Sequence, residues 1–215
     1  MNQHLPKAID GLIFDLDGTL WDASNTCTQA WNQTFKESGH GDHVLDDATI
    51  RSWSGMKVEK IFDQYLDFIP KSSQEEVLER YKHQESLFMK RYGGELFPGV
   101  KDVLRELSES FKLFIVSNCL AGYIENFISF NQLDGLFTDF ESSGNTGLAK
   151  SDNINLIIER NELHYPVYIG DTVWDQEAAG KSNVPFIYAA YGFGKANRPE
   201  ITIAAFDELR QLLLT

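Results

Sequence analysis

The sequence has few cysteines, no long apolar run and little positive charge. Its two cysteines, Cys27 and Cys119, form no CxxC pair, which excludes a disulfide-rich scaffold and fits a reducing compartment. The longest apolar stretches have only the length of a strand, so we expect no membrane span. The opening segment MNQHLPKAID holds no apolar run, so we expect no signal peptide and a cytoplasmic protein.

Basic residues are outnumbered by acidic ones, 19 to 32, which gives a formal net charge of -13. Such a surface repels the phosphates of nucleic acids and excludes nucleic-acid binding as the main task. A metal ion or a lysine can reverse the sign inside a pocket, so a small phosphorylated metabolite remains an acceptable partner. The charge balance does not distinguish a monomer from a homodimer.

Two kinds of hydrophobic pattern divide the sequence. Residues 10–16, DGLIFDL, form an apolar segment that ends at Asp17-Gly18, whereas residues 24–92 carry helical periodicity almost throughout. Further strands are expected at 112–116, 136–140, 166–169 and 185–189, and further helices at 99–109, 121–130, 152–161, 174–181 and 204–213. This alternation predicts an α/β fold with a doubly wound parallel sheet.

The helical block interrupts this alternation after the first strand. We expect residues 1–20 and 93–215 to form the α/β core and residues 21–92 to form a small helical cap. An insertion at this point lies at the carboxyl edge of the sheet, where ligands bind in open α/β sheets. The cap is therefore placed to act as a lid.

Two carboxylates, Asp15 and Asp17, stand at the end of the first strand. Side chains at positions i and i+2 point to the same side of a strand. Carboxylates held close repel each other, so one keeps its proton more readily than the other. The ionised aspartate can then attack while the protonated one delivers a proton to a leaving group. The alternative is a pair of solvated aspartates in a turn, because Asp and Gly commonly form turns.

Four motifs in order resemble those of the haloacid dehalogenase-like hydrolases. FDLDGTLWD, which begins before Asp15, resembles the first motif, and FIVSN, which contains Ser117, resembles the second. Lys150 resembles the third, and GDTVWD, with Asp171 and Asp175, resembles the fourth. The resemblance spans the chain and implies a Rossmann-like core with a helical cap, as in the phosphoglycolate phosphatase-like and sugar-phosphate mutase-like branch.

The resemblance implies a magnesium-dependent phosphatase that acts on a small phosphorylated metabolite. Asp15 would be the nucleophile that becomes an aspartyl-phosphate, and Asp17 would be the general acid and then the general base. Mg²⁺ would be bound by the carboxylates of Asp15 and Asp171 and by the backbone carbonyl of Asp17. Relatives that cleave carbon–halogen bonds lack the second aspartate, so its presence favours phosphoryl chemistry.

The same resemblance implies supporting roles for four further residues. Ser117, with Asn118, would bind the phosphoryl oxygens, and Lys150 would take part in catalysis. Asp175 would orient metal-bound water or pair with Lys150. Taken alone, Ser117-Asn118 is also typical of a helix cap, and Lys150 of a surface lysine.

The predicted cap carries the residues that would select the substrate. Lys57 follows Ser54-Gly55-Met56, where related caps place a specificity loop, so we nominate it for the substrate's distal group. A solvent-facing lysine is the alternative. Mutase relatives place a histidine where this chain has Cys27, which favours hydrolysis. A phosphomutase, an inorganic pyrophosphatase and a non-catalytic phosphate-binding protein remain alternatives, and the substrate is not decided.

Three weaker patterns have ordinary structural explanations. His40 and His43 flank a glycine-containing loop without further evident ligands, so solvated histidines are favoured over a zinc site. Tryptophans in the first motif and the cap are expected to pack in the core or hinge. The glycine-rich segment at 191–195 lacks phosphate-loop spacing and is expected to form a loop beside the site.

Overall fold

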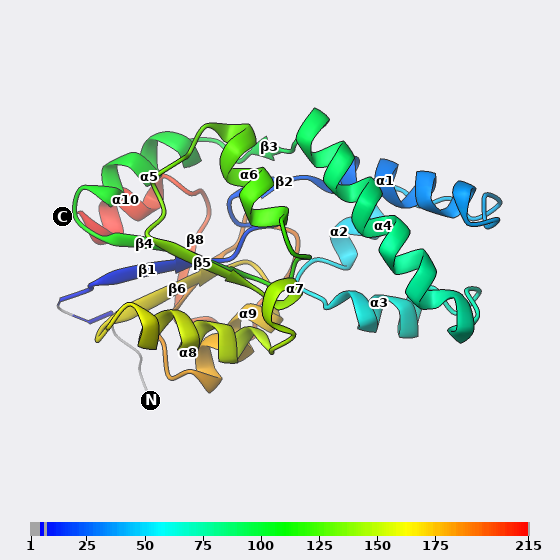
Figure 1. Cartoon of the computed structure of the whole chain (residues 1–215). Coiled ribbons are helices and arrows are strands. Elements are labelled where there is room, and N and C mark those ends of the chain that lie inside the picture. Colours follow the sequence, from blue (N-terminus) through cyan, green and yellow to red (C-terminus); the bar gives the residue numbers. More distant parts are fainter. Residues whose placement is uncertain (1–4, 7, 215) are drawn as a thin grey trace.

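The computed structural model, which describes residues 5–6 and 8–214, is built on a six-stranded parallel sheet (Figure 1). The strands lie in the order β5-β4-β1-β6-β7-β8. They are β1 (Gly11–Phe14), β4 (Lys112–Ser117), β5 (Asp139–Ser142), β6 (Pro166–Gly170), β7 (Phe186–Ala189) and β8 (Ile201–Ile203). The predicted doubly wound α/β fold is confirmed, and its central strand β1 carries the first motif.

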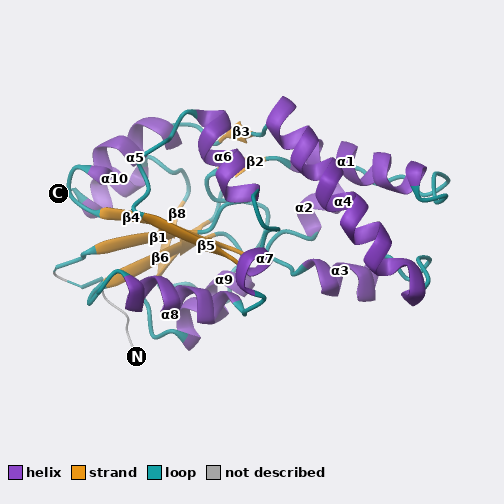
Figure 2. Cartoon of the chain, in the orientation of Figure 1, coloured by secondary structure: helices purple, strands orange, loops and turns teal. Residues whose placement is uncertain are grey.

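Helices cover both faces of the sheet (Figure 2). On one face lie α5 (Val100–Ser108), α6 (Tyr123–Asn131) and α10 (Glu208–Leu213), and on the other lie α8 (Lys150–Arg160) and α9 (Val173–Lys181). Alternate side chains of β1 point to opposite faces of the sheet. Leu12 and Phe14 belong to one apolar cluster, and Ile13 belongs to the other. Burial on both faces explains why β1, β4 and β6 are almost wholly apolar.

Four helices form a separate layer beyond the sheet (Figure 1). They are α1 (Ser24–Glu37), α2 (Asp47–Ser52), α3 (Val58–Tyr65) and α4 (Lys71–Tyr92). They bury their own apolar cluster, in which the rings of Trp31 and Tyr81 stack with centroids 3.7 Å apart. An aromatic core of this kind buries a large area per side chain, so a few residues can hold the four helices together.

A two-stranded antiparallel ribbon joins this layer to the sheet. It pairs β2 (Trp21–Asp22) with β3 (Glu95–Leu96). Gly94 fits the junction closely, because a Cβ there would lie 2.8 Å from the Trp21 ring. The ribbon was not predicted, since two-residue strands carry no periodicity and form only when distant segments meet.

Four further elements differ from the sequence-based expectation. The one-turn helix α7 (Ser143–Thr146) and the edge strand β8 were not predicted, and α10 begins later than expected. The strand expected at 136–140 begins and ends later, as β5, because Leu136 and Phe137 belong to the preceding loop and pack against the core from there. No helix in the described part of the chain is long and apolar enough to cross a membrane.

Candidate active site

The carboxyl edge of the sheet brings the predicted site residues together. Asp15 directly follows β1, and its backbone N–H donates to Ile169 of β6 at 2.8 Å. Because β1 lies between β4 and β6, Ser117 at the end of β4 and Asp171 directly after β6 lie on either side of it. Parallel strands place their carboxyl ends at one edge, which is why segments distant in sequence converge here.

Lys150 bridges two buried carboxylates. Its Nζ donates to Asp15 Oδ1 at 2.7 Å and to Asp175 Oδ1 at 2.6 Å, and its side chain is 4% exposed. Burial alone would lower the pKa of Lys150, but the adjacent Asp15 and Asp175 carboxylates raise it. The lysine is therefore a fixed positive charge at the centre of the site. Burial and the Asp175 charge raise the pKa of Asp15 to about 6, against the opposing effect of Lys150.

Asp175 is held on both carboxyl oxygens by the protein. Oδ1 accepts from Lys150 and, at 3.2 Å, from the Tyr168 hydroxyl. Oδ2 accepts the Thr172 backbone N–H at 3.0 Å and its hydroxyl at 2.5 Å, while Thr172 caps α9 in return. Four donors fill the four lone-pair positions of a carboxylate. Asp175 therefore positions Lys150 rather than offering an open ligand position.

Asp171 lies in a backbone cradle that only glycine permits. Its Oδ2 accepts the N–H groups of Phe193 and Gly194 at 2.7 and 3.2 Å. A Cβ on Gly18, which has φ +86°, would lie 2.3 Å from Asp171 Oδ2, and a Cβ on Gly192 would lie 2.3 Å from Asp171 Cβ. The glycine-rich segment thus packs directly on this aspartate, beyond the sequence-based expectation of a neighbouring loop.

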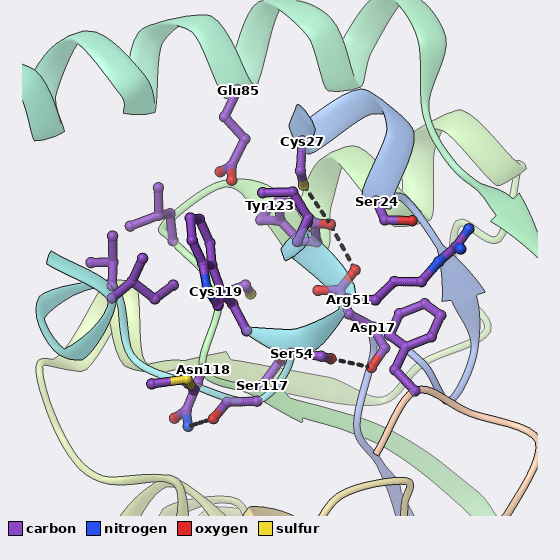
Figure 3. Close-up of a pocket in the computed structure, with 18 of the residues that line it drawn as sticks. Asp17, Ser24, Cys27, Arg51, Ser54, Glu85, Ser117, Asn118, Cys119 and Tyr123 are labelled. Carbon is purple, nitrogen blue, oxygen red and sulfur yellow. Dashed lines mark hydrogen bonds between the residues drawn. The ribbon is translucent and has the colours of Figure 1, made fainter. Parts of the chain in front are cut away.

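Asp17 occupies a different environment from Asp15. Its Oδ1 accepts the Tyr123 hydroxyl at 2.7 Å, and its backbone oxygen accepts the Ser54 hydroxyl at 3.1 Å (Figure 3). Burial, partly offset by the Tyr123 hydrogen bond, raises the pKa of Asp17 to about 7. A carboxyl group with this pKa can both donate and accept a proton near neutral pH.

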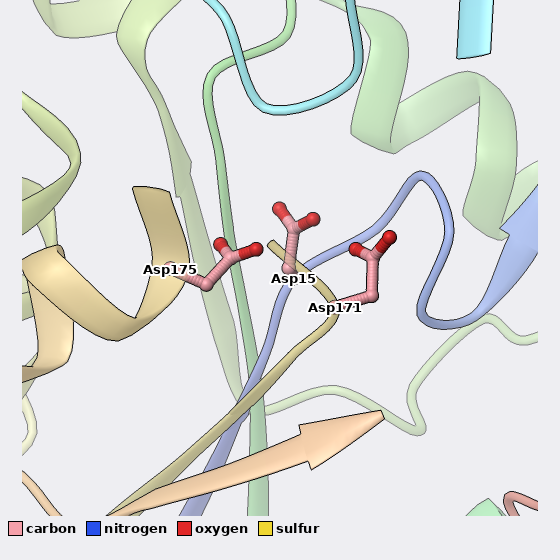
Figure 4. Close-up of side chains that lie close together, drawn as sticks. All are labelled: Asp15, Asp171 and Asp175. Atoms are coloured by element: carbon pink, nitrogen blue, oxygen red, sulfur yellow. The ribbon is translucent and has the colours of Figure 1, made fainter. Parts of the chain in front are cut away.

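The residues fit a divalent cation. One carboxyl oxygen of each of Asp15, Asp171 and Asp175 lies within 4.8 Å of the others, and Figure 4 shows the three carboxyl groups side by side. One ammonium leaves this buried cluster with excess negative charge, and burial with the neighbouring carboxylates raises the pKa of Asp171. Hydrogen bonds from the protein occupy all lone-pair positions of the Asp175 carboxylate. The carboxylates of Asp15 and Asp171 therefore remain to bind a hard cation, which prefers oxygen ligands.

Ser117 and Asn118 lie between the core and the helical layer. Ser117 is buried at the end of β4. Asn118 donates to the Gly55 carbonyl at 2.8 Å and accepts the Ser143 hydroxyl at 2.6 Å. Its amide thus ties the Ser54-Gly55 loop to the sheet edge. Burial raises the pKa of the Cys119 thiol next to it, so this cysteine is not an activated nucleophile.

A cavity of about 110 Å³ runs from the two motif aspartates into the helical layer (Figure 3). Its sheet end is lined by Asp15, Asp17 and Ser117, and its far end by Trp31, Trp53 and Glu85. Trp31 and Trp53 were expected only as packing residues. They do pack in the apolar cluster of the helical layer, but they also form a wall of this cavity.

Lys57 faces a second cavity. It precedes α3, and its Nζ donates to the Gly147 carbonyl at 3.1 Å. Lys57, Lys60, Lys181 and the buried Lys150 all line this space. The predicted histidine pair lies elsewhere, on the ring of Phe68, on which His43 stacks at 3.6 Å.

Several residues of the site escape sequence reasoning. Tyr123, which holds Asp17, and Glu85, which lines the cavity, belong to helices whose sequences carry no motif. Thr19 belongs to the first motif, and its hydroxyl donates to Asp171 Oδ1 at 3.3 Å. In that motif the nearby Asp17 was the more evident candidate for a functional residue. Tyr168 lies in the apolar strand β6, and its hydroxyl donates a hydrogen bond to Asp175. Such roles depend on which elements pack together.

Comparison with known proteins gives consistent results. A sequence profile of the haloacid dehalogenase-like hydrolases matches residues 12–189. The chain is 26% identical to a phosphoglycolate phosphatase of Aquifex aeolicus, over 94% of this chain and 95% of that protein. It is 28% identical to a phosphoglycolate phosphatase of Synechococcus elongatus, over 94% and 92% of the two chains.

Its fold is similar to that of a haloacid dehalogenase-like family protein from Streptococcus pneumoniae. The TM-score is 0.83 at 25% identity, and the match covers 95% of this chain and 98% of that one. Enzymes of this family generally use a divalent metal, and the buried acidic cluster is compatible with one. The chain belongs to the haloacid dehalogenase-like hydrolases, in the phosphoglycolate phosphatase-like branch, and is a phosphatase.

Proposed function

We propose that this phosphatase hydrolyses a small phosphorylated metabolite in a Mg²⁺-dependent reaction, through an aspartyl-phosphate on Asp15. One observation carries the proposal: the two motif aspartates have different partners. Asp15 is ion-paired to Lys150, whereas Asp17 is bonded to the neutral Tyr123 hydroxyl and has a pKa of about 7. One carboxyl is thus suited to attack and the other to proton transfer.

The first step forms a bond between an Asp15 oxygen and phosphorus and breaks the bond from phosphorus to the leaving oxygen. Asp17 gives its proton to that oxygen, so the product leaves as an alcohol. In the second step water attacks phosphorus, Asp17 takes the water proton and the bond to Asp15 breaks. Inorganic phosphate leaves, and both aspartates return to their starting protonation states.

Mg²⁺ would be held by the carboxylates of Asp15 and Asp171 and by the backbone carbonyl of Asp17. When bound, it supplies positive charge that offsets the repulsion between carboxylate and phosphate and spreads transition-state charge. Hydrogen bonds from Ser54 and Tyr123 hold the Asp17 backbone and side chain in place beside this position. Asp175 would fix the Lys150 ammonium toward the nucleophile.

The phosphoryl oxygens would be bound by Ser117 and Asn118, which line the cavity next to Asp15, with the help of Lys150, which is ion-paired to Asp15. We further propose that residues 1–20 and 93–215 act as the catalytic core and residues 21–92 as its cap. The relatives named phosphoglycolate phosphatase make phosphoglycolate a first substrate to assay. Lys57 stays a predicted contact for a distal group, which would then lie in the lysine-lined cavity.

The test is release of phosphate from p-nitrophenyl phosphate and from a panel of phosphorylated metabolites, with Mg²⁺ and then with EDTA. We expect chelation to abolish turnover and added Mg²⁺ to restore it. Asp15→Asn should remove turnover while the far-UV circular dichroism spectrum stays unchanged. Activity that ignores the metal, or survives this substitution, would refute the mechanism. Rearranged sugar phosphates without free phosphate would identify a mutase, and binding without turnover a non-catalytic protein.

A further inference from the structure

A short segment of the helical layer, residues 51–55, lies against the residues that would bind the metal. It runs from the end of α2 into the loop that precedes α3. The Ser54 hydroxyl donates to the Asp17 carbonyl at 3.1 Å (Figure 3). This carbonyl is the backbone oxygen proposed as a ligand for Mg²⁺. The helical layer and the metal site therefore meet at one peptide group.

The same segment also contacts the surroundings of Asp171. The Phe193 backbone N–H donates to the Asp171 carboxylate at 2.7 Å, and the guanidinium carbon of Arg51 lies 5.7 Å from the centroid of the Phe193 ring. Gly55 packs on Thr172, the residue that follows Asp171, because a Cβ on Gly55 would lie 3.0 Å from Thr172 Oγ1. One segment of the helical layer thus touches the supports of two proposed metal ligands, which come from different strands.

The orientation of the Asp17 carbonyl depends on hydrogen bonds rather than on backbone sterics. It belongs to the peptide unit between Asp17 and Gly18, and Gly18 has φ +86°. Glycine adopts both signs of φ, so the conformation of Gly18 does not by itself fix the plane of this peptide. The N–H of the unit donates to the Trp21 carbonyl at 2.9 Å, and its C=O accepts from Ser54. A carbonyl oxygen has two lone pairs, so the bond from Ser54 leaves one for a cation.

We propose that Ser54 is a positioning residue of the metal site, and that its hydrogen bond couples the packing of the helical layer on the sheet edge to the affinity for Mg²⁺. When residues 51–55 move away from the sheet edge, the Asp17 carbonyl loses its support and the site loses one fixed ligand. The coupling is reciprocal, so bound Mg²⁺ favours the packed position of this segment by the same factor. The inference rests on the proposed function, which gives Mg²⁺ this carbonyl as a ligand, and adds control of metal binding by the helical layer.

Isothermal titration calorimetry with Mg²⁺, without substrate, tests the first half of the coupling. Ser54→Ala should raise the Kd for Mg²⁺ about fivefold, the effect of one hydrogen bond between neutral groups. Ser54→Thr keeps the hydroxyl and should bind Mg²⁺ nearly as the wild type does. Ser52→Ala is the matched control, because the Ser52 hydroxyl donates to the Thr49 carbonyl within α2. Ser54 is only partly buried, so its truncation should leave the fold intact.

Hydrogen–deuterium exchange of peptides that cover residues 51–60, with and without Mg²⁺, tests the reciprocal half. Mg²⁺ should slow exchange in this segment about fivefold in the wild type and in Ser52→Ala. The slowing should nearly disappear in Ser54→Ala, even at Mg²⁺ concentrations that saturate this variant. In assays of phosphate release, Ser54→Ala should raise the Mg²⁺ concentration needed for half-maximal activity about fivefold and keep most of kcat at saturating Mg²⁺.

The possible outcomes separate this inference from the proposed function. Equal or tighter Mg²⁺ binding by Ser54→Ala would overturn the role of Ser54 and leave the phosphatase intact. Ser54→Thr that binds as weakly as Ser54→Ala would also overturn it, since the lost affinity would then follow from packing and not from the hydroxyl. Exchange in residues 51–60 that ignores Mg²⁺ in the wild type would overturn the coupling. If the wild type bound no Mg²⁺, the proposed Mg²⁺-dependent function would fail and this inference with it.

Discussion

Replacing Glu85 by glutamine should make the protein progressively more stable than the wild type as the pH rises. Glutamine has nearly the same shape, and its carbonyl can still accept the Tyr81 hydroxyl that now bonds Glu85 at 2.7 Å. It cannot ionise. The substitution therefore removes one property, the pH-dependent charge of a side chain that is 7% exposed, and leaves the packing of α4 in place.

The magnitude follows from the two pKa values of Glu85. It is 4.5 in an ordinary environment and about 8 in the folded protein, chiefly because of burial. Between these values the folded protein holds a proton that the unfolded chain has lost, so the free energy of unfolding falls as the pH rises. At about 1.4 kcal/mol for each unit, the full difference is at most about 5 kcal/mol, reached above pH 8.

Urea unfolding of both proteins at pH 5, 6, 7, 8 and 9 measures this difference directly. The two free energies of unfolding should differ by less than about 1 kcal/mol at pH 5, where Glu85 is neutral in the folded protein, and diverge at higher pH with Glu85→Gln the more stable. Taking the difference cancels the shared titration of Asp15 and Asp17. Glu75→Gln, at an exposed position on α4, should show no such trend. A difference that stays level from pH 5 to 9 would refute the argument from burial.

Two further predictions concern the metal site and its lysine. Lys150→Met should abolish turnover and lower the free energy of unfolding by about 3 to 5 kcal/mol at pH 8, because Asp15 and Asp175 lose their shared counter-charge; urea unfolding that matches the wild type would contradict this. Gly18→Ala should abolish Mg²⁺-stimulated activity, since its Cβ would strike the Asp171 carboxylate, as a Mg²⁺ titration of phosphate release will show. Gly180→Ala, with open space around its Cβ, is the control that should keep activity.

Local sequence was sufficient for the strands that form the centre of the fold. β1, β4 and β6 are almost wholly buried, and their apolar runs are bounded by turn residues, so each was predicted near its true position. The edge strand β8 and the β2–β3 ribbon were not, because short strands acquire their conformation from the strand beside them. The position predicted for β5 was too early for a related reason, because the apolar residues before this strand lie in a loop and pack against the core from there.

The functional residues of the four motifs could be identified from the sequence, because charged side chains are unusual at these positions. Carboxylates directly after a buried strand, as at Asp15 and Asp171, have few structural reasons to be there, so they mark a site. The sequence thereby determined the fold class, the family and the group of side chains that meet at one edge of the sheet. Those properties depend on hydrophobic periodicity and on motif residues, both of which are local.

Tertiary structure alone decided the environment of each of those side chains. The difference between Asp15 and Asp17 comes from Lys150 and Tyr123, which lie 135 and 106 positions away in the chain. The aromatic cavity with Glu85 arises only when helices α1 to α4 pack over the sheet edge. Proton affinity and substrate preference depend on burial and on neighbouring charges in space, and no local pattern of residues encodes those.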